Sequence, residues 1–446
     1  MYSADGNTTQ NQQAAETVMC DRYATVDGSD DAEGTKAAPF NTVQRLVDSL
    51  SAGQVGCLRG GIYTEPDKQV VFSDGGKEDD RIILRSYPGE TAEFRGSIYI
   101  RKGSDYVTVR NMRLDGSYGP VGKGHFKGDR NTKQTVRMMG NNVNIHDNDI
   151  TNRRPDGDPD LAGTCIILGS SKITAANTSI KGNRIHRCGQ MPRINREHGI
   201  YASYLKGAEI SDNFIYNNAD RGILLYPNSK GTLVEGNVVD SNGQNIVFGG
   251  SGNNVSSDNT IRNNVISNSQ AGWNVSSNWN QTSKVGWDNE VYDNCVWASG
   301  REPDYSQNGG VDPAEQGFNA YDNLLVEPTY ANREAGDFGL ESDGPCGAVV
   351  IKATYSRELL LLSCLFSLSC LFPPTADLAS DERLVIDWLE LHDADGTLPA
   401  PPPPSAGIPG IGTGLPGDCD VAPNPGLSTL QSALDGVCLP ASTVIT

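Results

Sequence analysis

The chain of 446 residues is poor in aromatic and basic residues and has no long apolar run. Aromatic side chains are 7% of the composition, and 36 Lys and Arg stand against 55 Asp and Glu, giving a formal net charge of −19. Such an acidic balance argues against a nucleic-acid partner, because that polymer binds clustered positive charge. An apolar run of about 18 residues is absent, so the sequence predicts no clear membrane span.

Asparagine and proline divide the chain into regions. Residues 141–346 contain 30 Asn, whereas the last 100 residues contain one Asn and 12 of the 24 Pro. We therefore expect a domain boundary near residue 347. The polar residues 1–19 are expected to form a disordered lead, since they lack periodicity and also the basic start and apolar run of a secretory signal.

Beyond the boundary, residues 348–398 contain an apolar segment and a short predicted helix whose role is unknown. Residues 399–446 form a Pro- and Gly-rich tail that begins with a polyproline stretch.

A loose repeat governs the middle of the chain. Asn followed by two apolar residues recurs at intervals of 24 to 35 residues, and each copy reads as a short strand. The repeated Asn residues are Asn148, Asn183, Asn213, Asn237, Asn264, Asn294 and Asn323. A second strand series begins at His198, Arg221 and Asn245, about one repeat apart. Two interleaved series with Gly and Asn at the corners predict a solenoid of β coils, in which the Asn side chains form a hydrogen-bonded ladder.

One amphipathic helix precedes the repeats. Phe40, Val43, Val47 and Leu50 recur at helical spacing, and Gly53 follows as a stop signal. Tyr23–Val26 reads as a short strand before the helix, and the apolar runs that follow the helix also read as strands.

The amino-terminal sequence RYATVDGSDDAEGTKAAPFNTVQRLVDSLSAGQVGCLRGGIYTE (residues 22–65) resembles the start of the pectate-lyase-like right-handed parallel β-helix proteins. The segments RIILRSYPGETAEFRGS and YVTVRNMRLDG resemble their first coils, and YDNLLVEPTYANREAGDFGL resembles their closing coil. The resemblance covers about Cys20–Cys346. It implies an all-β fold, a right-handed parallel β-helix whose amino end is capped by the helix at Phe40–Leu50.

The same resemblance implies contact with polysaccharides but does not select a reaction, because the superfamily includes lyases, epimerases, hydrolases and non-catalytic adhesins. Six of the ten cysteines lie in the predicted β-helix. A local pairing of 20 with 57, 165 with 188 and 295 with 346 is one of many that six cysteines allow, and buried thiols are the alternative. Disulfides on this fold would imply a secreted or cell-surface protein, which we expect to be a monomer.

The candidate catalytic residues lie at one predicted corner, where His198 and Arg221 each precede a strand. β-Elimination from a uronate needs a base for the proton beside the carboxylate and a cation that neutralises that carboxylate. We assign these roles to His198 and Arg221, one as proton acceptor and the other as carboxylate clamp, with Tyr201 or Tyr226 as an acid and Glu197 at the same corner. Alternation of inward and outward residues would expose Tyr201 and Tyr226 as a stacked sugar platform, but it also points His198 and Arg221 inward unless the corner bends. The alternative is that these residues form a salt network that only holds the coils together.

Further residues are expected to bind the polysaccharide or a calcium ion. Arg196, Tyr226 and Asn245 are expected to contact the polysaccharide at this corner. Lys123 belongs to the most basic stretch, Gly122–Asn131, which either attracts an acidic glycan or is only an exposed loop. Alternate carboxylates at Asp156, Asp158 and Asp160 resemble the start of a calcium loop, so Ca²⁺ is the expected cofactor; a solvated acidic turn is the alternative.

Known catalytic motifs of the superfamily do not transfer as complete sets. The paired aspartates of polygalacturonase-type hydrolases and the Arg-x-Pro-x-x-Arg element of the main pectate lyases are absent from the central repeats. The sequence therefore favours an extracellular uronate lyase acting on an acidic polysaccharide. The alternatives are a glycoside hydrolase on the same fold and a non-catalytic glycan-binding or adhesion rod.

Overall fold

The computed structural model describes residues 19–119, 131–153, 161–190, 195–279, 284–298, 307–312, 317–341 and 344–347. By internal contacts the chain divides into a unit of residues 18–354 and a second unit of residues 1–17 and 355–446, which lies outside the described residues. The predicted apolar segment and Pro-rich tail fall in undescribed parts, as does the predicted lead except for Met19.

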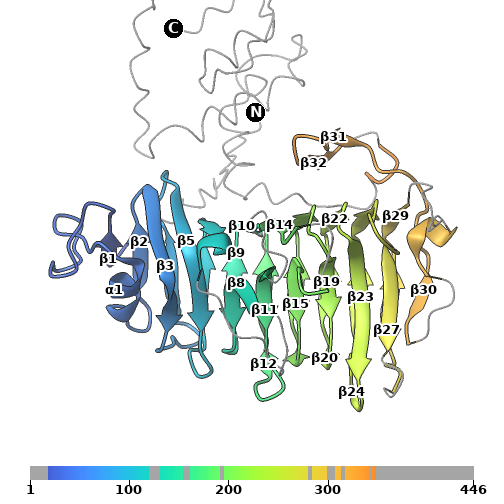
Figure 1. Ribbon diagram of the computed structural model, residues 1–446, viewed down its shortest axis with the longest axis horizontal. Coiled ribbons are helices and arrows are strands. Elements are labelled where there is room, and N and C mark those ends of the chain that lie inside the picture. The colour runs from blue at the N-terminus through green and yellow to red at the C-terminus, as the bar shows by residue number, and fades with distance from the viewer. Residues whose placement is uncertain are drawn as a thin grey trace, which may run out of the picture. The chain divides into compact units, whose positions relative to one another are not determined.

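Parallel strands from successive coils stack into long sheets (Figure 1), which confirms the predicted parallel β-helix. Eleven strands form the first sheet, in this order: β1 (Arg22–Ala24), β2 (Val55–Leu58), β4 (Ile82–Ser86), β6 (Val107–Arg110), β9 (Asn144–His146), β13 (Ser179–Lys181), β17 (Glu209–Ser211), β21 (Leu233–Glu235), β25 (Thr260–Arg262), β28 (Glu290–Tyr292) and β30 (Asn319–Tyr321).

The second sheet has 16 strands and two arms that meet at the long strand β5 (Ala92–Ile100). One arm, which we call the β15 arm, contains β8 (Asn131–Met138), β11 (Leu161–Leu168), β15 (Ile200–Ala202), β19 (Arg221–Leu225), β23 (Gln244–Ser251), β24 (Asn254–Val255) and β27 (Val275–Trp279). Strand β3 (Gly61–Phe72) pairs with the other side of β5. The β14 arm contains β7 (Arg113–Asp115), β10 (Asp149–Asn152), β14 (Arg184–Cys188), β18 (Phe214–Tyr216), β22 (Val238–Asp240), β26 (Val265–Ser267) and β29 (Cys295–Trp297).

Smaller elements complete the described part. Three short strands form a third sheet, and two 3-10 helices lie in connections: β12 (Ala175–Ala176), β16 (Leu205–Lys206), β20 (Ser229–Lys230), η1 (Gly116–Tyr118) and η2 (Gln307–Gly310). Each central coil therefore passes from the first sheet to the β14 arm, then to the β15 arm, and back.

The predicted asparagine ladder is confirmed at the corner between the first sheet and the β14 arm. Nδ2 of each Asn donates to Oδ1 of the Asn one coil further on, at 2.9–3.1 Å, from Asn148 through to Asn323. The residue before each ladder Asn has a positive φ, as at Asp147 (55°) and Gly182 (67°), so the chain turns within two residues. Asp, Asn and Gly tolerate this left-handed backbone best, which explains the composition of the corner.

The interior is filled by apolar side chains stacked in register. Val109, Ile145, Ile180, Ile210, Val234, Ile261 and Val291 each occupy the middle of a first-sheet strand, and each is fully buried. The pattern of one apolar residue between two polar ones arises because successive strand residues face opposite sides of the sheet.

The predicted helix is present but shorter than its apolar pattern. Helix α1 spans Val43–Asp48, and the Thr42 side chain accepts a hydrogen bond from the Arg45 backbone N–H at its start. Phe40 and Leu50 lie outside the helix, although both are buried in the core. The helix packs beside β1 and β2 at the amino-terminal end of the β-helix (Figure 1), where the sheets would otherwise end in an unpaired edge.

A carboxyl-terminal hairpin folds back over the β14 arm (Figure 1). It consists of β31 (Tyr330–Asn332) and β32 (Asp337–Leu340), which pair antiparallel. The phenol of Tyr330 lies 2.8 Å from the Ser267 hydroxyl, and Arg333 forms an ion pair of 2.9 Å with the buried Asp240. This arm is therefore covered near its carboxyl-terminal end, whereas the hairpin makes no such contact with the described residues of the β15 arm.

The three predicted disulfides are present: Cys20 with Cys57, Cys165 with Cys188, and Cys295 with Cys346. They link residues 37, 23 and 51 positions apart in the sequence. The last one ties the chain after the hairpin to β29. Stable disulfides are compatible with an oxidising compartment. In the described part of the chain, no helix has the length and apolar character to cross a membrane.

Candidate active site

The candidate site lies where the chain enters β15 and β19. Ile200 pairs with Ile223, and the Asp220 and Gly199 backbone N–H groups donate to the carbonyls of Glu197 and Arg221, each at 2.9 Å. His198 and Arg221 therefore occupy equivalent positions on neighbouring coils, as the sequence predicts. Gly follows each of them because a Cβ atom at Gly199 would lie only 2.7 Å from the Gly222 carbonyl oxygen.

His198 is held by Asp220. Its Nδ1 lies 3.3 Å from Oδ2 of Asp220 and 3.4 Å from the Arg221 backbone nitrogen, and the residue is 4% exposed. A protonated Nδ1 can donate to the Asp220 carboxylate, whereas an unprotonated Nδ1 accepts a hydrogen bond from the Arg221 backbone N–H. No described residue forms a hydrogen bond with Nε2.

The environment of His198 keeps its imidazole neutral at neutral pH. The pKa of His198 is lowered to about 4, mainly by burial and also by the nearby Arg221 and Arg196. The Asp220 carboxylate acts in the opposite direction. A neutral imidazole can accept a proton.

The sequence predicts that Arg221 is a cation available to the substrate carboxylate, but the structure places it in an ion pair with Asp220. Its Nη1 donates to Oδ2 of Asp220 at 2.6 Å and to Oδ1 of Asn195, and the residue is 8% exposed. The charge of Arg221 is therefore balanced by Asp220, which is fully buried. In this geometry Arg221 fixes the carboxylate that contacts His198.

The tyrosines do not form the predicted stacked platform. Tyr201 pairs in register with Leu224, and the Tyr226 ring packs against Gly249 of the following coil, where a Cβ atom would lie 2.7 Å from it. The two rings are offset by two residues along the strand direction, because the turns before β15 and β19 align Ala202 with Leu225. Tyr201 still lies at the site, with its ring centroid 5.5 Å from that of His198. Burial, and then Tyr226 and Tyr204, raise the pKa of Tyr201.

The other predicted residues are placed as follows. Glu197 is fully buried, and its Oε1 accepts from the Gln190 backbone N–H at 3.3 Å. Arg196 is half-buried and close enough to lower the pKa of both His198 and Tyr201.

Asn245 differs from its predicted position at the corner. The register pairs Arg221 with Gln244, 23 residues further along the chain, so Asn245 lies one residue past the equivalent position. Asn245 is fully buried, and its Nδ2 donates to Oδ1 of Asn274 at 2.8 Å. It belongs to a second interior asparagine column with Asn218 and Asn242, which the sequence analysis missed. A buried column cannot contact a polysaccharide, so we remove Asn245 from the site.

Lys123, Asp156, Asp158 and Asp160 lie outside the described residues. Within the described ranges, no three His, Cys, Asp or Glu side chains are grouped so that they could hold a metal ion.

A row of outward-facing residues crosses the β15 arm and was also missed. The register aligns one residue from each strand, and we call this row the outward file: Val71, Tyr99, Arg137, Ile167, Tyr201, Leu224, Val247 and Ser276. Alternation was the signal that could have revealed it, since Arg137 lies between the inward-facing Val136 and Met138.

Comparison with known proteins agrees with this architecture. Residues 92–320 match the family model described as the right-handed β-helix region, which spans about half of the chain, and the chain belongs to this family. A curated relative, pectate lyase PEL9 of Emericella nidulans, is 41% identical over 79 residues. That match covers 18% of this chain and only 19% of the relative.

Solved structures with similar folds include two lyases. Pectate lyase Pel9A has a TM-score of 0.46 at 13% identity, covering 73% of this chain and 90% of its own. A rhamnogalacturonan lyase has a TM-score of 0.42 at 12% identity, covering 71% of this chain and 91% of its own.

Proposed function

We propose that this protein is an extracellular enzyme that acts on an acidic polysaccharide, and specifically a uronate lyase. The observation that carries the proposal is the neutral His198, whose Nδ1 lies beside the buried Asp220 carboxylate and whose Nε2 bonds to no described residue. The local identity to a curated pectate lyase and the three disulfides support the substrate class and the compartment.

The proposed reaction is a β-elimination. Nε2 of His198 takes the proton from C5 of the uronate, the C4–O bond breaks, and a C4–C5 double bond forms. Arg196 neutralises the uronate carboxylate, so that the charge developing beside it is stabilised. The Tyr201 phenol supplies a proton to the departing oxygen, which its raised pKa suits, because the hydroxyl stays protonated. Asp220 and Arg221 position His198 rather than contacting the sugar.

Calcium is the proposed cofactor, with Asp156, Asp158 and Asp160 as its ligands. Carboxylate oxygens are the ligands that Ca²⁺ prefers, and the ion would help to neutralise an acidic substrate. We expect Ca²⁺ to raise the melting temperature of the wild-type protein relative to a chelator, and to have no effect on a variant with Asn at all three positions. Equal melting temperatures of the wild-type protein with Ca²⁺ and with chelator would remove the ion from the proposal.

The two alternatives have less support. A glycoside hydrolase needs two carboxyl groups that reach the substrate, whereas Glu197 and Asp220 at this corner are both fully buried. A non-catalytic rod would need only the ladders and the stacked core. It does not explain a neutral histidine whose Nδ1 lies beside a buried carboxylate.

A product assay tests the proposal. Wild-type protein and His198→Gln are incubated with pectate, alginate and uronate-containing glycosaminoglycans, and the ultraviolet absorbance of unsaturated uronides is followed. We expect product from one polymer with the wild type and none with the variant. New reducing ends without unsaturated product would indicate a hydrolase, and glycan binding with neither product would indicate the rod.

A further inference from the structure

Arg137 is a cation without a counter-ion on the outer surface of the β-helix. Among the described residues it forms no ion pair and no hydrogen bond, and its Nε is buried without a partner. Several other arginines of the β-helix are paired, as Arg59 is with Glu90 and Arg262 is with Glu235. A guanidinium that has lost part of its hydration is costly unless an anion or an acceptor compensates for it.

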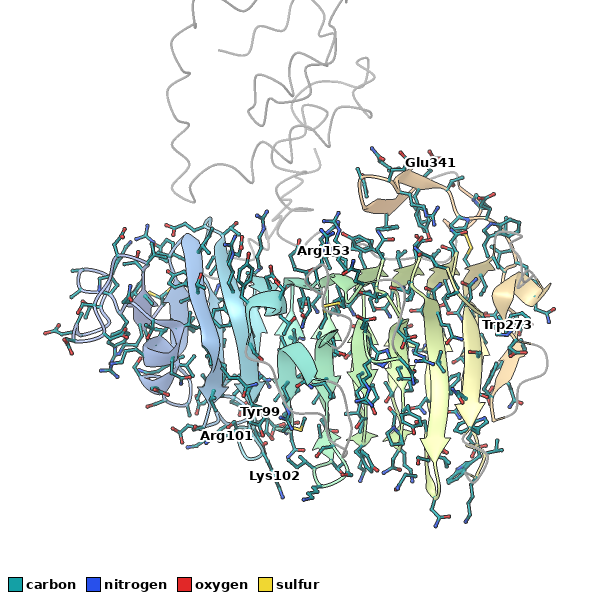
Figure 2. The ribbon with its side chains drawn as sticks, viewed as in Figure 1. Tyr99, Arg101, Lys102, Arg153, Trp273 and Glu341 are labelled. Atoms are coloured by element: carbon teal, nitrogen blue, oxygen red, sulfur yellow. A yellow bond between two sulfur atoms is a disulfide. The ribbon has the colours of Figure 1, made fainter. Side chains whose placement is uncertain are left out.

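The Tyr99 ring fixes the orientation of this cation. The guanidinium carbon of Arg137 lies 4.9 Å from the ring centroid, one strand away in the outward file. Figure 2 labels Tyr99 on β5, with Arg101 and Lys102 immediately after the strand. Stacking on an aromatic face leaves the N–H edge of a guanidinium free to bind a planar carboxylate through two hydrogen bonds.

The outward file also sets the spacing between Arg137 and the candidate site. Arg137 pairs with Ile167, and Ile167 pairs with Tyr201, so two strand intervals separate Arg137 from the tyrosine beside His198. This corresponds to about 10 Å along the β-helix, or about two linked sugar residues. Ile167 lies between them in the file and is buried, so it adds no competing charge.

We propose that Arg137 and Tyr99 form a binding subsite for the carboxylate of a uronate about two sugar residues from the one that is processed at His198. The inference rests on the proposed function and adds to it a polymer that lies along the axis of the β-helix and carries repeated carboxylates. A sulfate ester offers similar charge but a tetrahedral array of oxygens, and we commit to the carboxylate because Arg binds its planar oxygen pair with two hydrogen bonds.

Binding of defined oligosaccharides tests this subsite without reference to turnover. The affinities of wild type, Arg137→Gln and Lys206→Gln are measured for acidic oligouronides and for their fully methyl-esterified forms. Lys206 is an exposed residue of β16 on another sheet, so its variant controls for the loss of one positive charge. We expect Arg137→Gln to weaken binding of the acidic oligouronide at least about tenfold, as for a lost hydrogen bond to a charged group.

The control should bind the acidic ligand as the wild type does, and the methyl-esterified ligand should not distinguish wild type from Arg137→Gln. Disaccharides, too short to reach both positions, should bind all three proteins equally. Equal affinity of wild type and Arg137→Gln for the long acidic ligand overturns the subsite and leaves the proposed function standing. No binding of any uronide by the wild type would overturn both. A preference for sulfated over carboxylated ligands that depends on Arg137 would overturn the choice of carboxylate.

Discussion

At the scale of single residues, the site depends on the buried carboxylate of Asp220. Asp220 contacts both His198 and Arg221, and all three are less than a tenth exposed. Charges that are buried together hold one another in place, and removal of one partner leaves the other uncompensated. The two basic residues therefore have different expected mutational signatures.

His198→Gln should lower the rate of uronide formation at least about a hundredfold, a typical contribution of a general base. Its melting temperature should stay close to that of the wild type, because Asp220 keeps its ion pair with Arg221. Arg221→Gln should instead unfold more easily, by about 3–5 kcal/mol, since it leaves Asp220 charged and buried without that partner. Steady-state kinetics and urea unfolding of both variants provide the measurement. Unchanged stability of Arg221→Gln together with a large loss of rate would return Arg221 to the role of carboxylate clamp.

His146, which lies on β9 away from the candidate site, should make the stability of the protein depend on pH. Burial, followed by the charges of Arg110, Lys181 and Arg81, lowers the pKa of His146 from 6.5 to about 4. Between pH 4 and pH 6.5, His146 therefore binds a proton in the unfolded chain but not in the folded protein. The contribution of His146 to stability is therefore complete above pH 6.5 and is lost as the pH falls toward 4.

His146→Gln should abolish this part of the acid sensitivity. The difference in unfolding free energy between high and low pH should shrink by on the order of 2 kcal/mol relative to the wild type. Urea unfolding above pH 6.5 and near pH 4 measures the difference. Identical pH dependence in both proteins would show that this histidine titrates normally in the folded state.

At the scale of elements, the asparagine ladder connects each coil to the next. Asn237 donates to the Ile210 carbonyl and to Asn264, and accepts from Asn213, whereas Asn323 lies at the end of the ladder. Each buried polar group left without a partner costs about 1–3 kcal/mol. A residue in the middle of the ladder should therefore matter more than the last one.

We expect Asn237→Ala to lower the unfolding free energy by about 3 kcal/mol and Asn323→Ala by about 1 kcal/mol. Chemical denaturation with circular dichroism detection compares them, with Asn332→Ala on the exposed hairpin as a control for the side-chain change. Equal effects at positions 237 and 323 would mean that the ladder does not act as a connected column.

The predicted alignment between coils was correct for the asparagine ladder and for His198 with Arg221. It failed for Asn245 and for the tyrosine platform. Alternation within a strand shows which residues share a face, but it does not show which residue of the next coil lies beside them. That alignment depends on the number of residues in each coil, which differs along the chain, as between Ile166–Ile200 and Ile200–Ile223.

At the scale of the whole β-helix, stability is added coil by coil, and the two ends differ. The amino end is covered by α1, whereas the last first-sheet strand, β30, is exposed at all three residues. The carboxyl-terminal hairpin is attached to the side of the rod and is tied down by Cys295–Cys346.

Replacing Cys295 and Cys346 by Ala should release this hairpin while the coils stay folded. The bond closes a loop of 51 residues, and its loss should cost about 4 kcal/mol in the chain-entropy account. We expect faster amide hydrogen exchange in β31 and β32 and an unchanged far-ultraviolet circular dichroism spectrum. Unchanged exchange in the hairpin would show that its side-chain contacts with Asp240 and Ser267 are sufficient to hold it.

The sequence by itself determined the architecture and indicated the local cysteine pairing as one of several possible pairings. Repeated Asn residues before apolar pairs specify a corner and a strand through local chemistry. The Asp, Asn or Gly before each one adopts the left-handed turn, and the Asn side chain hydrogen-bonds to the Asn of the next coil. The cysteine partners lie within 51 residues of each other, so proximity in sequence carried that information.

Only the tertiary structure decided what surrounds the candidate catalytic residues. His198 and Arg221 were expected at one corner, but Asp220 neutralises Arg221 and contacts His198. Arg137, two coils from Tyr201, forms no ion pair with the described residues. Pairing of charges and their burial depend on distances between coils. These distances are set by the packing of residues far apart in the sequence, which no local pattern encodes.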